Sequence, residues 1–263
     1  MKNKVISGIR FLLILIIIAC LAILGKRGYD YWTNAQNNKH IQGLIEESKS
    51  EVVASADENS SKDQEDPEAD FKKLEEQNLY LLKKFKEENL DVVAIVEIPG
   101  TDIKYPILQA NDNDYYLRRG LNEEYDIAGS IFMDANNEPD FTDDNTVIYG
   151  HHLEIDSMFT PLDQYRDEEF AKNHRRIYIT TEEGLMEYEV FSAYGIPADY
   201  DYRSLDFAYE ADKIDYFNTL KANSEVDLDL SSGFTSDDSI ITLSTCEYDY
   251  DDQRLAIQAV RVK

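Results

Sequence analysis

The chain has 263 residues, of which 43% are hydrophobic, and a formal net charge of −27. This length accommodates one domain of ordinary size plus an appendage. The charge excludes nucleic acid as a partner, because the chain cannot neutralise phosphates, and it argues against a soluble face that lies on an anionic membrane. One of the two cysteines lies in an N-terminal apolar run, which excludes an intramolecular disulfide framework.

Residues 1–27 have the pattern of a membrane anchor. An apolar run over 11–25 is flanked by basic residues on both sides: Lys2, Lys4, Arg10, Lys26 and Arg27. With the apolar residues 5–9 added, the segment is long enough to span the hydrocarbon core as a helix. The basic N-terminus predicts that the short end stays inside the cell and the rest of the chain lies outside.

Two processing events are alternatives to this uncleaved anchor. A cleaved signal peptide requires a site of small residues after the run, and none is convincing. Lipidation of Cys20 is the other alternative, because Ile17-Ile18-Ala19-Cys20 resembles a lipobox. The apolar run continues past Cys20, however, where a lipoprotein would usually turn polar.

Residues 28–70 are polar and, from Glu46 onward, strongly acidic. Such a segment lacks the apolar content to bury a core, so we expect a stalk or linker that is helical at most near Ile41–Ile45. The catalytic domain is expected over residues 71–263. It begins with a helix, because one face repeats at helical spacing: Phe71, Leu74, Asn78, Leu81, Leu82 and Phe85.

Short strand-like segments separated by turn residues follow from residue 92. We expect strands over 92–98, 103–108, 129–133, 146–149, 176–181, 185–194, 240–246 and 255–262, with one inserted helix between Ala208 and Ala222. Many short strands with few helices are typical of a closed or nearly closed β-barrel. The fold class is therefore mainly β with helices.

Three residues at the ends of such strands could perform acyl transfer. Cys246 ends one apolar run, Arg254 begins the next, and His151 follows Val147-Ile148-Tyr149-Gly150. A thiolate attacks a carbonyl, a guanidinium stabilises the resulting oxyanion, and an imidazole exchanges protons with the leaving and entering groups. Each residue alone also has an ordinary structural explanation, and a cysteine in a strand is usually a small buried hydrophobe.

Taken together, these residues resemble the sortases. The resemblance rests on Tyr149-Gly150-His151 and Thr242-Leu243-Ser244-Thr245-Cys246, followed by Arg254, and it extends over residues 71–263. Further matching segments point to class B: Ile98–Thr101, Tyr105–Ile107, Asp112–Leu117, Gly129–Asp134 and Met158-Phe159. The family implies a closed eight-stranded β-barrel, with an N-terminal helix packed on it and a helix inserted before the cysteine strand.

The resemblance also implies the roles of individual residues. Cys246 is the expected nucleophile, His151 the general acid and base, and Arg254 the clamp for the oxyanion and substrate. Ser244, Thr245 and Glu247 are expected to bind substrate. His152 would point to the other side of a continuing strand. We expect no cofactor and no metal, since the acidic cluster 249–252 lacks the ligand spacing of a calcium loop.

The expected function is that of a membrane-anchored cysteine transpeptidase. Through a thioacyl intermediate it would cleave the C-terminal sorting signal of secreted proteins and join them to a cell-wall amine. A pilin-polymerising sortase, whose acceptor is a lysine, is an alternative within the family. A cell-wall cysteine peptidase is disfavoured, because such enzymes place the cysteine before the histidine in the chain. A non-enzymatic alternative is a stalked β-domain that only binds a surface partner. It would require the occurrence of Cys246, His151 and Arg254 at strand ends to be a coincidence.

Overall fold

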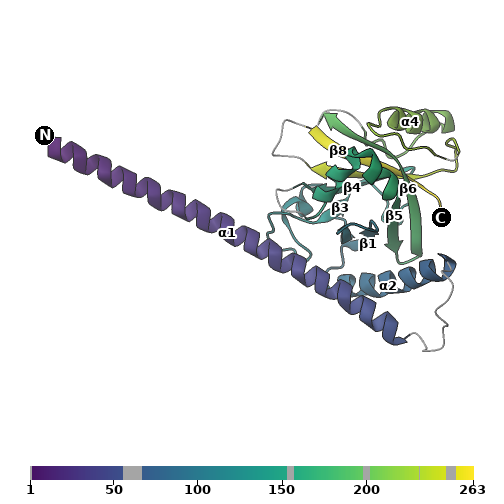
Figure 1. Ribbon diagram of the computed structural model, residues 1–263, viewed down its shortest axis with the longest axis horizontal. Helices are drawn as coiled ribbons and strands as arrows, with labels where there is room; N and C mark the ends of the chain where they lie inside the picture. The colour runs from purple at the N-terminus through teal and green to yellow at the C-terminus, as the bar shows by residue number, and fades with distance from the viewer. Residues whose placement is uncertain (1, 56–66, 153–156, 198–201, 231, 247–252) are drawn as a thin grey trace.

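The computed structural model describes residues 2–55, 67–152, 157–197, 202–230, 232–246 and 253–263. Its centre is a closed barrel of eight strands in the order β1-β2-β3-β4-β7-β8-β6-β5 (Figure 1). The strands are β1 (Val92–Glu97), β2 (Lys104–Leu108), β3 (Ile131–Met133), β4 (Asn145–His151), β5 (Arg176–Thr181), β6 (Gly184–Pro197), β7 (Ile240–Cys246) and β8 (Gln253–Arg261). The predicted barrel is therefore confirmed.

Each of the eight strands has a neighbour on both sides in the closed barrel, and two of the eight neighbour pairs are parallel. β2 runs parallel to β3, and β4 runs parallel to β7, while the remaining neighbours are antiparallel. A parallel pair needs a long crossover connection. The crossover from β4 to β7 contains β5, β6 and the helix α4 (Glu210–Ala222). This helix confirms the one predicted before the cysteine strand.

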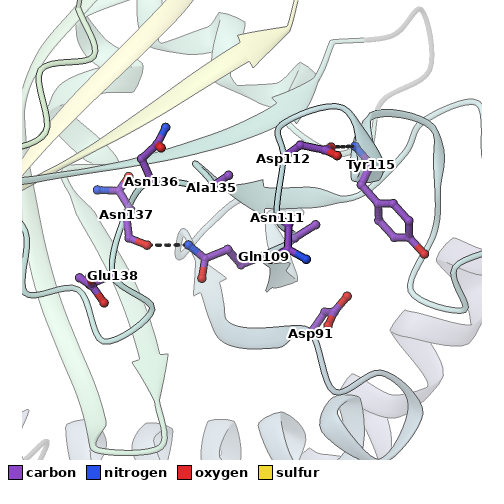
Figure 2. Close-up of a pocket in the computed structure, with 10 residues that line it drawn as sticks. Asp91, Gln109, Asn111, Asp112, Tyr115, Ala135, Asn136, Asn137 and Glu138 are labelled. Atoms are coloured by element: carbon purple, nitrogen blue, oxygen red, sulfur yellow. Dashed lines mark hydrogen bonds between the residues drawn. The ribbon is translucent and has the colours of Figure 1, made fainter.

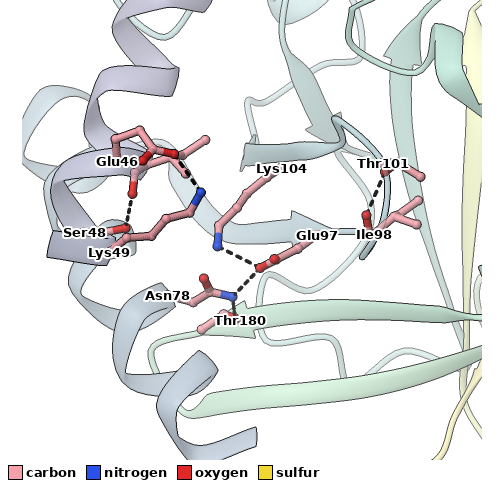
Figure 3. A network of polar contacts seen from close by, with 10 residues as sticks. Glu46, Ser48, Lys49, Asn78, Glu97, Ile98, Thr101, Lys104 and Thr180 are labelled. Carbon is pink, nitrogen blue, oxygen red and sulfur yellow. Dashed lines mark hydrogen bonds and ion pairs between the residues drawn. The ribbon is translucent and has the colours of Figure 1, made fainter. Parts of the chain in front are cut away.

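The expected N-terminal helix of the domain is α2 (Pro67–Glu88), which covers one side of the barrel. Its apolar face contributes Leu81, Leu82 and Phe85 to the buried core. A polar contact fixes the helix against the sheet: Asn78 Nδ2 donates to Glu97 Oε2 at 3.1 Å and to Thr180 Oγ1 at 3.2 Å (Figure 3).

Residues 28–55 differ from the expected stalk. They continue the N-terminal apolar segment as a single helix, α1 (Lys2–Ser55), whose C-terminal part lies beside α2 (Figure 1). Ile41 and Ile45 belong to the buried core and help to attach a segment that is otherwise mostly polar. The composition of the segment did not indicate this packing, because its mean hydropathy is hydrophilic.

The N-terminal part of α1 projects away from the barrel (Figure 1). It is the one described helix that is long and apolar enough to cross a membrane, and the apolar window makes no contact that buries it. Three shorter helices complete the described structure: the 3-10 helices η1 (Tyr115–Arg118) and η2 (Thr160–Arg166), and α3 (Glu168–Asn173).

Candidate active site

Strand pairing brings His151 and Cys246 together at one end of the barrel. β4 and β7 are parallel neighbours whose register begins at Asn145 opposite Ile240 and ends at His151 opposite Cys246. Both strands terminate at this pair. The histidine and the cysteine, 95 positions apart in sequence, are therefore direct neighbours on adjacent strands.

Arg254 reaches the same end from the other side of β7. β8 pairs antiparallel with β7, with Ser244 opposite Ala256, and Leu255 N donates to Thr245 Oγ1 at 2.9 Å. Continuing this register by two residues places Arg254 level with Cys246. The three residues predicted for catalysis thus occupy neighbouring positions on β4, β7 and β8.

A backbone carbonyl holds the imidazole of His151 by a hydrogen bond. The residue is 2% exposed, and its Nε2 lies 2.6 Å from Leu117 O in η1. Because a carbonyl oxygen only accepts, Nε2 must carry a proton in this contact. Nδ1 is then the nitrogen that can accept and return a proton during a reaction.

Close packing next to His151 requires a glycine at position 150. A Cβ added there would lie 2.5 Å from Ile131 Cδ1 and 2.5 Å from a ring carbon of Phe159. Phe159 is fully buried, and its backbone N donates to His151 O at 3.2 Å. The absence of a side chain at position 150 therefore lets Phe159 and Ile131 pack closely against β4, directly before His151.

A buried tyrosine links Arg254 to the cysteine strand. Arg254 is half-buried, and its Nη1 donates to Tyr202 Oη at 3.2 Å. Tyr202 is fully buried, and its hydroxyl also bonds to Ser244 Oγ at 2.7 Å. Tyr202 was not among the predicted site residues, since a tyrosine in a polar connection carries no local sequence signal of such a role.

The predicted substrate-binding residues have different positions. Ser244 and Thr245 are fully buried and bond internally, Ser244 to Tyr202 and Thr245 to the backbone of Leu255. In this arrangement they brace the strand that ends at Cys246. Glu247 and the acidic cluster 249–252 lie outside the described residues. Direct substrate contact by the three predicted residues stays a prediction.

The titratable side chains near His151 in sequence, those of His152 and Tyr149, are hydrogen-bonded to aspartates. His152 Nε2 lies 2.5 Å from Asp163 Oδ2 of η2, so the second histidine serves a different contact from His151. Tyr149 lies two residues before His151 and donates to Asp134 Oδ2 at 2.9 Å. Burial, with the nearby Asp134 charge, raises the pKa of Tyr149 far above its ordinary value. Its phenol therefore stays protonated and cannot act as the base.

A polar groove of about 620 Å³ lies beside η1 (Figure 2). Its side chains are engaged with the chain itself: Gln109 Nε2 donates to Asn137 O at 2.7 Å, and Asp112 Oδ1 accepts from Tyr115 N at 2.8 Å. The groove contains none of the predicted catalytic residues, and its hydrogen bonds brace η1. Among the described residues there is also no group of three or more His, Cys, Asp or Glu that could hold a metal ion.

Comparison with known proteins agrees with this geometry. Residues 96–262 match the Sortase domain family. The chain belongs to the sortase family. Sortase B of Listeria monocytogenes is 35% identical over 246 residues, which cover 90% of this chain and 93% of the relative. Sortase B of Staphylococcus aureus is 32% identical over 208 residues, which cover 74% and 84%.

Solved class B sortases have the same fold. A Staphylococcus aureus sortase B–substrate complex aligns with a TM-score of 0.66 at 30% identity, covering 75% of this chain and 96% of that structure. Sortase B from B. anthracis in complex with AAEK1 aligns with a TM-score of 0.63 at 36% identity, covering 70% and 85%. The chain is thus a class B sortase, and its enzyme class is that of a cysteine transpeptidase.

Proposed function

We propose that this sortase is anchored in the cell membrane by α1 and acts on the outer face of a Gram-positive-type cell. It cleaves the C-terminal sorting signal of secreted proteins and joins each protein to an amine of the cell wall. The observation that carries the proposal is the register of β4, β7 and β8, which puts His151 and Arg254 on either side of Cys246.

The first half of the reaction forms a thioester. His151 Nδ1 first takes the proton of the Cys246 thiol. The resulting thiolate attacks the carbonyl carbon of the scissile peptide bond, and Arg254 stabilises the oxyanion that develops. Nδ1 of His151 then gives a proton to the departing amine as the carbon–nitrogen bond breaks. The C-terminal tail leaves, and the acyl group remains on the sulfur.

The second half exchanges the thioester for a new amide. An acceptor amine attacks the same carbonyl, loses a proton to His151 Nδ1, and displaces the Cys246 sulfur as thiolate. The bonded Nε2 keeps the ring in one orientation through both halves, so one nitrogen performs both proton transfers. Arg254, held by Tyr202, meets the oxyanion in each half.

The N-terminal part of α1 supports the proposed membrane anchor. Its residues 6–24 expose large apolar side chains, which a membrane would cover. With the basic N-terminus inside, the catalytic domain lies outside the membrane. Both proposed substrates, a translocated protein and a cell-wall precursor, occur on that side.

Polymerisation of pilins is the alternative within the family, with a lysine of another pilin as the acceptor amine. The described part of the active site is compatible with either amine. Hydrolysis by a peptidase would use the same first half, with water as the acceptor. The three functions therefore differ only in what resolves the thioester.

The test is peptide cleavage by the full-length chain in detergent. A panel of fluorogenic sorting-signal peptides is incubated with a glycine-based amine, with a lysine-bearing peptide, and without any amine. We expect cleavage that requires Cys246 and gives an amide-linked product with the glycine-based amine. Linkage to lysine alone would support the pilin alternative, whereas hydrolysis in every arm would contradict transpeptidation.

A further inference from the structure

The carbonyl that holds His151 belongs to a segment that is itself fixed from the opposite side. Leu117 O accepts from His151 Nε2, and the backbone of Gly129 lies directly against this oxygen. Gly129 has a φ of +59°, and a Cβ there would lie 2.4 Å from Leu117 O. Next to it, Ser130 N donates to Tyr116 O at 3.0 Å. The position of residues 126–130 therefore decides the position of the Leu117 carbonyl.

Asp126 fixes this segment. Its backbone N donates to Arg118 O at 3.0 Å, on the far side of Leu117, and its Oδ1 accepts from Ala128 N at 2.8 Å. Two amides of α1 complete its contacts: Asn34 Nδ2 donates to Oδ1 at 2.9 Å, and Asn37 Nδ2 donates to Oδ2 at 2.6 Å.

This contact between helix and loop is buried. Asp126 is 2% exposed and Asn34 is 1% exposed. A carboxylate out of water must have its hydrogen-bonding capacity filled, and within the described residues no cation forms an ion pair with Asp126. The two asparagines are therefore the side chains that stabilise the carboxylate in its position.

The same face of α1 lies directly against the active-site end of the barrel. A narrow cavity is lined by Asn37 and Ile41 on the helix side and by Gly129, Ser130 and Met158 on the barrel side. Apolar packing of Ile41 and Ile45 already attaches the helix. The buried hydrogen bonds also fix the position of the helix relative to Asp126, because hydrogen bonds tolerate only a small range of distances and angles.

We propose that Asn34 and Asn37 position the histidine of the active site through Asp126 and the Leu117 carbonyl. They are positioning residues, since none of them touches the reacting atoms. The inference rests on the proposed function in that it takes His151 as the proton-transfer group. It follows that the docked part of the helix that carries the membrane anchor is a component of the active site.

The first test reads the imidazole directly. The full-length chain, with ¹⁵N-labelled histidine, is studied in detergent by NMR at a pH where the rings are neutral. The chain has four histidines, and His151→Gln assigns the relevant signals. We expect His151 to be the Nε2–H tautomer in the unmodified chain. In Asn37→Ala and Asp126→Ala, the Nδ1–H tautomer should appear alongside it.

Ser48→Ala is the matched control on the same helix. Ser48 is fully buried, but its hydroxyl donates to Ile45 O of its own helix and makes no contact with Asp126. This variant should keep the Nε2–H tautomer. His40, on α1 and bonded to Glu88 at 2.7 Å, is an internal reference for docking of the helix in every variant.

The second test separates positioning from stability. In Asn37→Ala, kcat for peptide cleavage should fall about tenfold with KM unchanged, because a small displacement of a catalytic group lowers the rate rather than binding. Ser48→Ala should retain kcat. An unchanged tautomer and kcat in Asn37→Ala would overturn the proposal, as would equal losses of kcat and melting temperature in the Asn37 and Ser48 variants. If neither the unmodified chain nor any variant cleaves a peptide, the proposed function fails. The tautomer comparison then still tests whether Asn37 and Asp126 position His151.

Discussion

At the scale of single residues, hydrogen bonds from buried groups hold two of the candidate catalytic side chains, the buried His151 and the half-buried Arg254. Arg254 depends on Tyr202, which is bonded in turn to Ser244 on the cysteine strand. A guanidinium offers several N–H donors in a fixed plane, so the bond to Tyr202 helps to set the orientation of that plane. A fixed orientation supports the proposed role of Arg254 at the oxyanion.

We predict that Arg254→Ala lowers kcat for sorting-signal cleavage by about 10²–10³-fold, the usual cost of losing an oxyanion donor. Arg254→Lys should recover only part of the rate, because an ammonium group lacks the planar fork. Steady-state kinetics on the fluorogenic peptide measures both. Arg261→Ala is the control, since Arg261 is an exposed residue at the other end of the same strand. A similar loss in the Arg261 variant would refute a specific role for Arg254.

The sequence indicated the candidate catalytic residues more readily than the groups that support them. His151, Cys246 and Arg254 stand at strand ends in recognisable motifs, and the strand register brings these positions together, while their catalytic roles stay a prediction. Leu117 acts through its backbone carbonyl, which every residue type provides, so no side-chain pattern could reveal it. Tyr202 is distant in sequence from both of its partners, and only tertiary structure shows the contact.

At the scale of elements, α1 is the main departure from expectation. Its docked part places Ile41 and Ile45 in the buried core and forms surface pairs with α2, such as Lys84 with Glu47 at 3.1 Å. The surface pairs are exposed and contribute little. The isoleucines contribute more than these surface pairs, because nearly all of their apolar surface is removed from water.

Ile45→Ala should therefore destabilise the catalytic domain by about 2–5 kcal/mol, the usual cost of truncating a buried isoleucine. Ile45 is 2% exposed in the structure. Urea unfolding of the chain in detergent, followed by tyrosine fluorescence, measures the change. Gly43→Ala is the control, because a Cβ at Gly43 meets nothing within 4 Å. If Ile45→Ala were as stable as the unmodified chain, this helix would not be docked as described.

The strands were predictable because the signal for each is local. β5 and β7 match the expected ranges 176–181 and 240–246, and the others differ by a few residues at their ends. The continuation of α1 to Ser55 was missed, because this segment docks through a few side chains, such as Ile41, Ile45 and Asn34, on a surface that is distant in sequence. Tertiary contacts of this kind outweigh average composition.

At the scale of the whole molecule, one unbroken helix joins the apolar segment to the catalytic domain. Asn34 lies nine positions after Gly25, a rise of about 14 Å along a helix. The docked domain therefore begins close to the end of the segment proposed to cross the membrane. Tyr29 and Trp32 lie between them, exposed and with ring centroids 6.0 Å apart, where aromatic residues favour the membrane interface.

We predict that Trp32 sits among lipid headgroups. It is the only tryptophan of the chain, so its fluorescence in nanodiscs reports one position. Quenchers attached near the headgroup should reduce this fluorescence strongly, whereas quenchers at the ends of the acyl chains should not. A fragment that begins at Tyr29 should show no quenching. Equal emission with and without headgroup quenchers would contradict the proposed depth of the anchor.

In the proposed reaction Cys246 carries the acyl group of the substrate, and intact mass spectrometry tests this role most directly. The full-length chain is mixed with a cleavable sorting-signal peptide and quenched in acid within one turnover. We predict a mass increase equal to the acyl fragment of the peptide, located by digestion at Cys246 and absent from Cys246→Ala. An adduct at another residue, or turnover that persists in Cys246→Ala, would contradict the account.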